Sequence, residues 1–275
     1  MWNIILAGIL GLPLLLLAVV TAPLIAVLAI PPLLLLVFRK EGGSDLPPDQ
    51  VVIAGGSSGI GLSIAQECVR LGISKVTILA RNPKRLEDAE VMLQALKKRS
   101  EQCIQTVSVS VSDHQALQKV AKDLKIMKEE RVVLFNCAGI PYTTEFDKIP
   151  LEQYEKLVKT NQLGAVYLVK AFLPYLHKGC IVLTSSAAAQ VGVYGYTAYS
   201  PTKYALRGFA ETLHAELIRT KPQVSIQLAF PVDTATPGYE EESKMMPEIT
   251  KALNDSAGLE SADEYVNRCC DSNSP

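Results

Sequence analysis

This sequence of 275 residues lacks the clustered residues that build metal centres and redox dithiols, and it lacks the excess of positive charge that nucleic-acid surfaces carry. Its three histidines form no cluster along the chain. Its six cysteines show no CxxC pair and no cysteine–histidine spacing suited to zinc. The net charge of −1 gives no electrostatic attraction to nucleic acid. We therefore expect no metal site and no nucleic-acid partner.

Charge is absent from residues 1–38, and Arg39 and Lys40 then follow together. A membrane span needs about 20 apolar residues, so the run predicts one long span or a tight pair of short ones. It is longer than the apolar core of a secretory signal and lacks the basic start. The two basic residues favour a cytosolic flank. We expect a membrane anchor over 1–38 and a linker over 39–49.

From residue 50 onward, short apolar runs alternate with helical patterns. The predicted strands are 51–54, 75–80, 103–109, 131–136, 180–185 and 224–230. Strands that are apolar at nearly every position are buried on both faces, as in a parallel sheet between helix layers. The pattern predicts one α/β domain over 50–275, a Rossmann-like doubly wound parallel sheet. Ligands are expected at the carboxyl ends of its strands.

The segment "AGGSSGIG", residues 54–61, lies where the first predicted strand turns into the first predicted helix. Its glycines allow a sharp turn and a close approach of backbone to a pyrophosphate, and the helix N-terminus offers free N–H groups. A tight turn alone would also explain the glycines, but their place at the first strand–helix junction favours nucleotide binding. The expected cofactor contacts are Gly55, Gly56, Ser57, Ser58, Gly59, Ile60 and Gly61.

The end of the second predicted strand indicates which dinucleotide is bound. An NAD site usually carries an acidic residue there for the ribose hydroxyls, whereas this sequence has Ala80, followed by Arg81 and Arg85. Guanidinium groups suit a 2′-phosphate. The two arginines could instead be solvated residues at the start of a helix, but this interpretation is disfavoured because positive charges there oppose the helix dipole. We therefore expect NADPH rather than NADH.

Three further motifs follow in order: "NCAG" from Asn136, "TNQLG" around Asn161, and "TSSAAAQVGVYGYTAYSPTK", in which Ser186 precedes Tyr199 by thirteen residues and Lys203 follows it by four. With the glycine loop, this set over residues 51–238 resembles the short-chain dehydrogenase/reductase family. The resemblance implies an oxidoreductase with an Asn–Ser–Tyr–Lys tetrad.

The resemblance assigns Tyr199 as the proton donor to the substrate carbonyl. Free tyrosine has a pKa of about 10, and Lys203, one helical turn away, is expected to lower it by favouring the phenolate. In the family this lysine also bonds the nicotinamide ribose, so both residues count as cofactor contacts. Pro201 between them fits only if the helix begins near Tyr199 or Ser200.

The family spacing selects Ser186 to hydrogen-bond the carbonyl oxygen. Neighbouring residues of a strand point to opposite faces, so only one of Ser185 and Ser186 should enter the site. Asn161 is implied to hold a water that links the lysine to solvent. Asn136 and Val232, the latter in place of the family's usual glycine, complete the expected cofactor contacts.

Within the family, "GGSSGIG", "YGYTAYSPTKYALRG" and "FPVDTATPGYEEE" behind an apolar N-terminus resemble reductases of long-chain 3-keto sphingoid bases. This likeness implies NADPH-dependent reduction of a lipid ketone at the endoplasmic reticulum membrane, with the domain facing the cytosol. The alternatives are a membrane reductase of a steroid, retinoid or 3-oxoacyl-CoA, and a catalytically silent NADPH-binding scaffold. A homo-oligomer is compatible with the sequence.

Two C-terminal features remain. Met245, Met246 and Ile249 in the stretch 237–249 suit either an acyl-chain groove or the anchoring side of an acidic surface helix. The final helical pattern, "SADEYVNRCC", precedes only five residues, whereas family domains continue into another strand. We therefore expect the sheet to lack its last strand.

Overall fold

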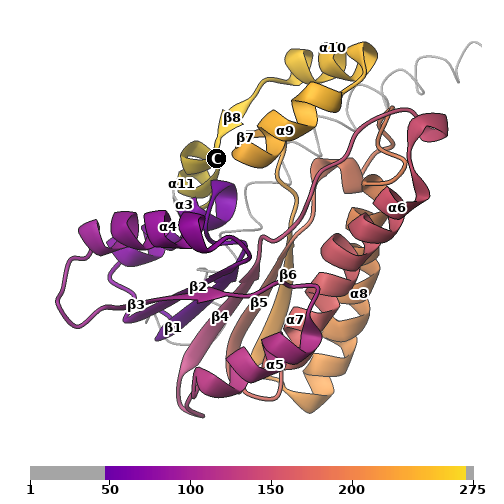
Figure 1. Ribbon diagram of the computed structural model, residues 1–275. Helices are drawn as coiled ribbons and strands as arrows, with labels where there is room; N and C mark the ends of the chain where they lie inside the picture. The colour runs from indigo at the N-terminus through magenta and orange to yellow at the C-terminus, as the bar shows by residue number, and fades with distance from the viewer. Residues whose placement is uncertain (1–46, 271–275) are drawn as a thin grey trace, which may run out of the picture.

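The structure, a computed structural model, describes residues 47–270 (Figure 1). Its centre is a six-stranded parallel sheet in the order β3-β2-β1-β4-β5-β6. The strands are β1 (Gln50–Ala54), β2 (Lys75–Ala80), β3 (Cys103–Ser108), β4 (Arg131–Asn136), β5 (Lys178–Thr184) and β6 (Val224–Ala229). The order reverses direction between β1 and β4, which is where such sheets bind ligands. The predicted doubly wound parallel sheet is confirmed.

Helices cover both faces of the sheet (Figure 1). The connections between strands carry α3 (Gly59–Arg70), α4 (Pro83–Ala95), α5 (His114–Asp123), α6 (Leu151–Leu157), α7 (Gly164–Phe172) and α8 (Ser200–Thr220). Strand β1 shows why two layers form. Val51 and Ile53 belong to the apolar core shared with α3 and α4, whereas Val52 and Ala54 belong to the core shared with α5, α7 and α8. Alternate side chains point to opposite faces, and both faces are buried.

The predicted bounds hold for β2 and β4 and differ by one or two residues elsewhere. Strand β5 begins earlier than predicted, because Lys178 and Gly179 pair with β4 although neither is apolar. Gly179 has φ +132, and a Cβ there would lie 1.9 Å from the carbonyl oxygen of Val132. The two backbones can meet at this point only because the residue is glycine.

After β6 the chain crosses the carboxyl ends of the strands. This segment contains β7 (Thr234–Ala235), α9 (Pro237–Met245), α10 (Glu248–Ala257), β8 (Glu260–Ser261) and α11 (Ala262–Cys270). Tyr265 and Val266 of α11 are buried in the core shared with α3. Between residues 47 and 270, no helix combines the length and apolar character that crossing a bilayer requires. The predicted anchor over 1–38 lies outside the described residues.

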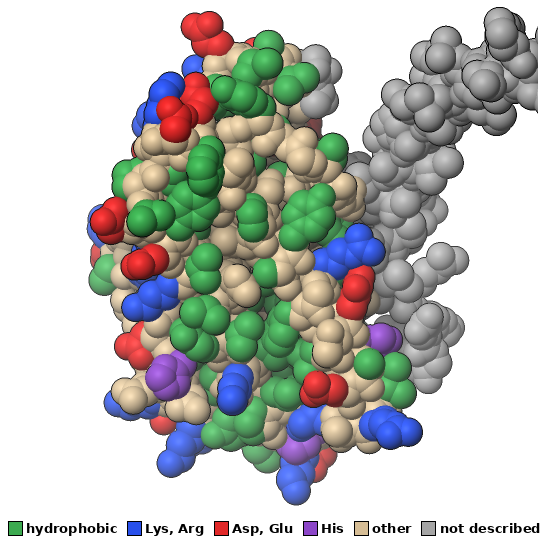
Figure 2. All heavy atoms as spheres, turned by 90° about the vertical axis from the view of Figure 1, so that its right-hand side faces the viewer, with side chains coloured by type: hydrophobic (Ala, Val, Ile, Leu, Met, Phe, Trp, Pro, Cys, Tyr) green, Lys and Arg blue, Asp and Glu red, His purple; other side chains and the backbone are tan. Residues whose placement is uncertain are grey.

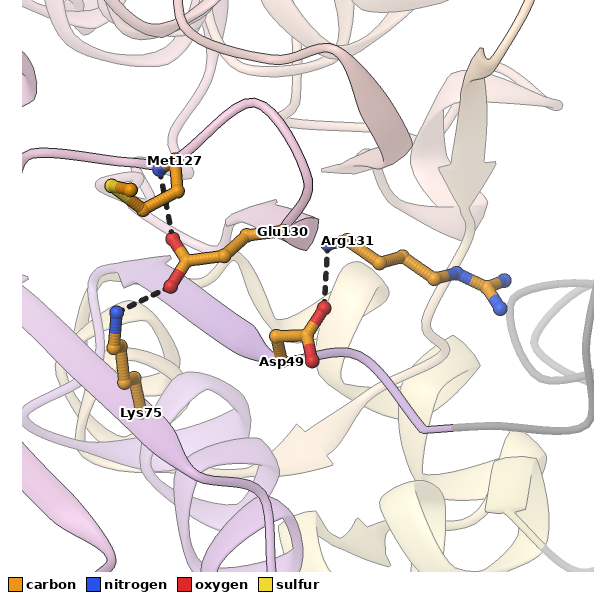
Figure 3. Close-up of polar contacts among 5 residues, drawn as sticks. All are labelled: Asp49, Lys75, Met127, Glu130 and Arg131. Atoms are coloured by element: carbon orange, nitrogen blue, oxygen red, sulfur yellow. Dashed lines mark hydrogen bonds and ion pairs between the residues drawn. The ribbon is translucent and has the colours of Figure 1, made fainter.

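Polar contacts tie the amino ends of three strands together (Figure 3). The Asp49 carboxylate accepts a hydrogen bond from the Arg131 backbone N–H at 2.8 Å, and the Asp49 N–H donates to the Arg131 carbonyl at 2.9 Å. Glu130 forms an ion pair with Lys75 and accepts from the Met127 N–H at 3.0 Å. These contacts join β1, β2 and β4 at the end opposite the candidate site.

Candidate active site

The Tyr199–Lys203 pair stands at the start of helix α8. Tyr199 is the residue before the first turn, and the helix begins at Ser200 with Pro201 in that turn. A first-turn residue needs no intrahelical N–H bond, so proline costs nothing there. The Thr202 hydroxyl donates to the Tyr199 carbonyl at 2.7 Å. The predicted helix start is confirmed.

The two adjacent serines after β5 point in different directions. Ser185 is buried, and its hydroxyl donates to the backbone carbonyl of Lys203 at 2.9 Å. Ser186 begins the short 3-10 helix η3 (Ala187–Ala189), accepts from the Ala188 N–H at 3.1 Å, and hydrogen-bonds to Tyr199. Ser186 therefore contacts Tyr199, whereas Ser185 bonds to the backbone of helix α8.

Lys203 is 5% exposed, and its Nζ donates to the carbonyl of Thr184 at 2.9 Å. The same nitrogen lies 5.6 Å from the centroid of the Tyr199 ring. Burial lowers the pKa of Lys203 to about 8. The ammonium therefore sits behind the tyrosine ring at the carboxyl end of β5, bound to backbone.

Asn161 lies in a π-helical segment, η2 (Val158–Leu163), that joins α6 to α7. Its Oδ1 accepts from the Ile140 N–H at 2.8 Å, and its Nδ2 donates to the Ile140 carbonyl at 2.9 Å and to Thr202 at 3.3 Å. A Cβ on Gly139 would lie 3.4 Å from Asn161 and 3.5 Å from Lys203. Asn161 thus fixes the turn after β4, which contains Gly139 and Ile140, in the position next to Lys203. Single π turns often mark functional sites, and no sequence signal indicated this one.

The pKa of Tyr199 is raised, first by burial and then by the negative charge of Glu242, and the Ser186 hydrogen bond opposes this rise. The expectation that Lys203 lowers this pKa is therefore wrong for the protein without ligands. The physical reason is that the site buries the phenol and places a carboxyl group nearby, while the lysine bonds to Thr184.

Glu242 on α9 is a site residue that the sequence reasoning missed. It is 9% exposed, and burial raises the pKa of its carboxyl to about 7. It stands in a run of three glutamates that suggests a solvated surface. A usable signal was its spacing from Tyr239, three residues earlier, which places the two side chains on the same face of the helix.

The glycine loop has the geometry of a phosphate cradle. Gly55 and Gly59 have φ +81 and +53, and a Cβ on Gly61 would lie 2.3 Å from the Gly55 carbonyl oxygen. Ser58 precedes α3 without a side-chain cap, and the first turn of α3 carries no acidic residue. The helix N-terminus is therefore open to an anion. Gly56, Ser57 and Ile60 occupy the same turn.

The other predicted cofactor residues lie at the same end of the sheet. Asn136 ends β4, and its Oδ1 is buried without a hydrogen-bond partner, which an additional donor would satisfy. Arg81 and Arg85 are exposed beyond β2, where Asn82 caps α4 by accepting from the Arg85 N–H at 3.1 Å. Val232 lies after β6 and is 40% exposed. These residues fit a bound dinucleotide with a phosphate on its ribose.

The segment after β6 connects this cradle to the tyrosine. A Cβ on Gly59 would meet the Thr236 side chain at 2.9 Å. The Thr143 hydroxyl donates to the Glu242 carbonyl at 3.2 Å, and the Thr250 hydroxyl donates to the Tyr194 carbonyl at 2.9 Å. Within residues 47–270, no group of three histidine, cysteine, aspartate or glutamate side chains is arranged to hold a metal ion.

Comparisons with known proteins agree with this arrangement. The short chain dehydrogenase family matches residues 49–247. A 3-ketodihydrosphingosine reductase of Mus musculus is 37% identical over 219 residues, and a 3-dehydrosphinganine reductase of Danio rerio is 35% identical over 221. Each alignment covers 78% of this chain and 65% of the relative's length.

Among solved structures, an alcohol dehydrogenase from the archaeon Thermococcus sibiricus, complexed with 5-hydroxy-NADP, is similar with a TM-score of 0.65. It is 25% identical, and the match covers 80% of this chain and 89% of that one. The family match extends over most of the described residues and includes the glycine loop, Asn161, Ser186, Tyr199 and Lys203. The chain therefore belongs to the short-chain dehydrogenase family.

Proposed function

We propose that this chain reduces the 3-keto group of 3-dehydrosphinganine, a long-chain 2-amino-3-ketone, to the alcohol sphinganine, with NADPH as cofactor. The observation that carries the proposal is the hydrogen bond between Ser186 and Tyr199, with Lys203 directly behind the tyrosine ring. The substrate is suggested by the relatives, which are named for this reduction.

The dinucleotide would be held by the turn from Gly55 to Gly61 and by the N-terminus of α3. Arg81 and Arg85 would bind the ribose 2′-phosphate through charge-assisted hydrogen bonds. No carboxylate stands at the end of β2, where Ala80 replaces it, so a 2′-phosphate meets no repulsion there. The complex of the Thermococcus sibiricus enzyme with 5-hydroxy-NADP supports the choice of a phosphorylated nicotinamide nucleotide.

The residues around Tyr199 are suited to protonate a ketone oxygen as it becomes negative. The hydride comes from the nicotinamide when the cofactor is bound. Ser186 and Tyr199 donate hydrogen bonds to the oxygen, and these bonds strengthen as charge develops. Because burial raises the pKa of Tyr199, the phenol remains protonated near neutral pH. An alkoxide is a stronger base than a phenolate, so Tyr199 transfers its proton to it, and Lys203 then stabilises the phenolate.

A long-chain substrate needs apolar surface near the site, and exposed apolar side chains occur on the elements around it. They are Phe146, Leu151, Val191, Tyr194, Met245, Ile249 and Leu253. Figure 2, which views the right-hand side of Figure 1, shows apolar side chains on the upper part of this face. Met245 and Ile249 are 41% and 57% exposed and remain candidates for an acyl-chain surface, whereas Met246 is buried.

We also propose that the domain acts at the endoplasmic reticulum membrane and faces the cytosol. The charge-free run over 1–38, followed by Arg39 and Lys40, supports this placement. A lipid ketone is most concentrated in the membrane, so an anchor would keep the site close to its substrate.

The direct test is a reduction assay of the purified full chain in detergent with 3-dehydrosphinganine and either NADPH or NADH. We expect sphinganine as the product by mass spectrometry, with NADPH strongly preferred. A steroid ketone, a retinal and a 3-oxoacyl-CoA serve as competing substrates. Turnover of one of these without turnover of 3-dehydrosphinganine would refute the substrate. A chain that does not bind NADPH would instead be a non-catalytic protein.

A further inference from the structure

The Glu242 carboxyl is buried, its negative charge acts on the catalytic tyrosine, and its Oε1 has no hydrogen-bond partner. The two preceding glutamates of α9 differ from it. Glu240 and Glu241 are exposed, and Glu241 pairs with Lys244 at 2.6 Å. A carboxylate oxygen that is buried without a donor is unfavourable. A hydrogen-bond donor supplied by a ligand would therefore stabilise Glu242, whereas the exposed Glu240 and Glu241 are solvated and do not require one.

Contacts fix where this carboxyl group lies. The Tyr196 hydroxyl hydrogen-bonds to it, and the Tyr196 ring packs edge-on against the Tyr199 ring, with centroids 5.7 Å apart and planes at 62°. Thr143, which is fully buried, holds the backbone of α9 at this point by donating to the Glu242 carbonyl at 3.2 Å. The carboxyl is thus connected to Tyr199 through the ring of Tyr196, and it lies on helix α9 of the segment that follows β6.

The charges around Glu242 leave a negative excess. The titratable groups that act on it or feel its charge are Tyr196, Tyr199, Lys203, Asp233 and Tyr239. Lys203 is the cation among them, and its Nζ bonds to the Thr184 carbonyl. Asp233 adds a second acid. A ligand that binds near both Tyr199 and Glu242 is therefore favoured if it carries a positive charge.

We propose that Glu242 binds the ammonium group of the substrate and so selects ketones that carry an amine on the neighbouring carbon. This inference rests on the proposed function. When the carbonyl oxygen meets Tyr199 and Ser186, the amine is one carbon away from the reacting centre. An ammonium has three N–H donors, and one of them supplies the missing partner of Oε1.

The ionisation states agree with this assignment. Burial raises the pKa of Glu242 to about 7, and an amine next to a carbonyl has a pKa of about 8. Near neutral pH the amine is therefore largely protonated and Glu242 is about half ionised, and the attraction between the two lowers the pKa of the carboxyl and raises that of the amine, so that both are charged in the complex. Binding of the cation also offsets the Glu242 charge, which adds to the effect of burial in raising the pKa of Tyr199. Recognition of the amine thus makes the tyrosine a stronger acid.

The test compares two substrates on three full-length proteins. The substrates are 3-dehydrosphinganine and the 1-hydroxy-3-ketone of equal chain length that lacks the amine. The proteins are the wild type, Glu242→Gln, and the exposed control Glu240→Gln. Loss of one member of a buried charge pair typically costs 2–5 kcal/mol, so kcat/KM of Glu242→Gln for the amino ketone should fall by at least about 30-fold. Its kcat/KM for the amine-free ketone should not fall and should rise if anything, because the Glu242 charge that raises the pKa of Tyr199 is gone. Its NADPH affinity should change little, and Glu240→Gln should match the wild type.

The outcomes separate this inference from the function on which it rests. Equal losses of Glu242→Gln on both substrates, or an amine-selective loss in Asp233→Asn instead, would overturn the role of Glu242 and leave the reductase activity standing. A wild-type protein that reduces neither ketone would overturn both. Should Glu242→Gln not fold, the wild type alone decides, because equal kcat/KM for the two substrates would also contradict the proposal.

Discussion

Replacing Glu242 with glutamine should make the ligand-free protein more stable at alkaline pH, even though it removes a functional group. Glutamine has the shape of a protonated glutamate and cannot ionise. It therefore keeps the contacts of α9 with Tyr196 and Thr143 and omits the cost of a buried negative charge.

The size of the effect follows from the pKa of the carboxyl. Its ordinary value is 4.5, and burial in the folded protein raises it to about 7. A difference of one pKa unit is worth about 1.4 kcal/mol, so the folded state prefers the neutral form by about 3 kcal/mol. This contribution to stability is fully present below the unfolded pKa of 4.5 and is lost as the pH rises through about 7, the folded pKa.

Urea unfolding of the wild type, Glu242→Gln and Glu240→Gln measures this effect. The difference in unfolding free energy between Glu242→Gln and the wild type should grow by about 3 kcal/mol between about pH 4 and about pH 9. Glu240 is exposed, so Glu240→Gln should follow the wild type at every pH. A difference that stays constant with pH would show that the folded pKa of Glu242 is ordinary and would refute the reasoning.

Three further predictions concern the site. Tyr199→Phe should lower kcat by at least about 100-fold because the proton donor is lost, while fluorescence titration shows unchanged NADPH affinity; substantial residual turnover would place the donor elsewhere. Arg81→Ala should raise the KM for NADPH far more than that for NADH in steady-state assays, and equal effects would contradict the 2′-phosphate contact. Gly61→Ala should destabilise the fold by about 3 kcal/mol or more in urea unfolding, because its Cβ would lie 2.3 Å from the Gly55 carbonyl oxygen. Gly192→Ala, where a Cβ meets nothing within 4 Å, is the control, and similar losses in both would contradict the cradle geometry.

The fold was predictable where a buried strand appears in the sequence as a run of apolar residues. Strands β2 and β4 are apolar over most of their length and have the predicted bounds. Strand β5 begins at Lys178, before its apolar part, because pairing with β4 depends on backbone contact rather than on side-chain polarity. The π-helical segment around Asn161 was not predictable, because its sequence VKTNQL contains no glycine or proline that would set it apart from the helices on either side.

The site was predictable to the extent that it depends on spacing along the chain. The first turn of α8 presents Tyr199 and Lys203 together, and Pro201 correctly indicated where the helix begins. Alternation along a strand separated Ser185 from Ser186 but did not say which one faces Tyr199. That choice is made by the hydrogen bond from Ser185 to the Lys203 carbonyl, which requires the folded position of α8.

The electrostatics of the site were not predictable, because they arise between segments far apart in the chain. The backbone of Glu242 is held by Thr143, 99 residues earlier, and the Glu242 charge adds to the effect of burial in raising the pKa of Tyr199. A lysine one turn after a tyrosine suggests a lowered phenol pKa, yet the fold adds a buried carboxyl that acts in the opposite direction. Burial makes Tyr199 a weak acid, and the charge of Glu242 weakens it further until the carboxyl is neutralised. A cationic substrate does so as it binds, and a neutral ketone does not, so discrimination between them should appear in kcat as well as in KM.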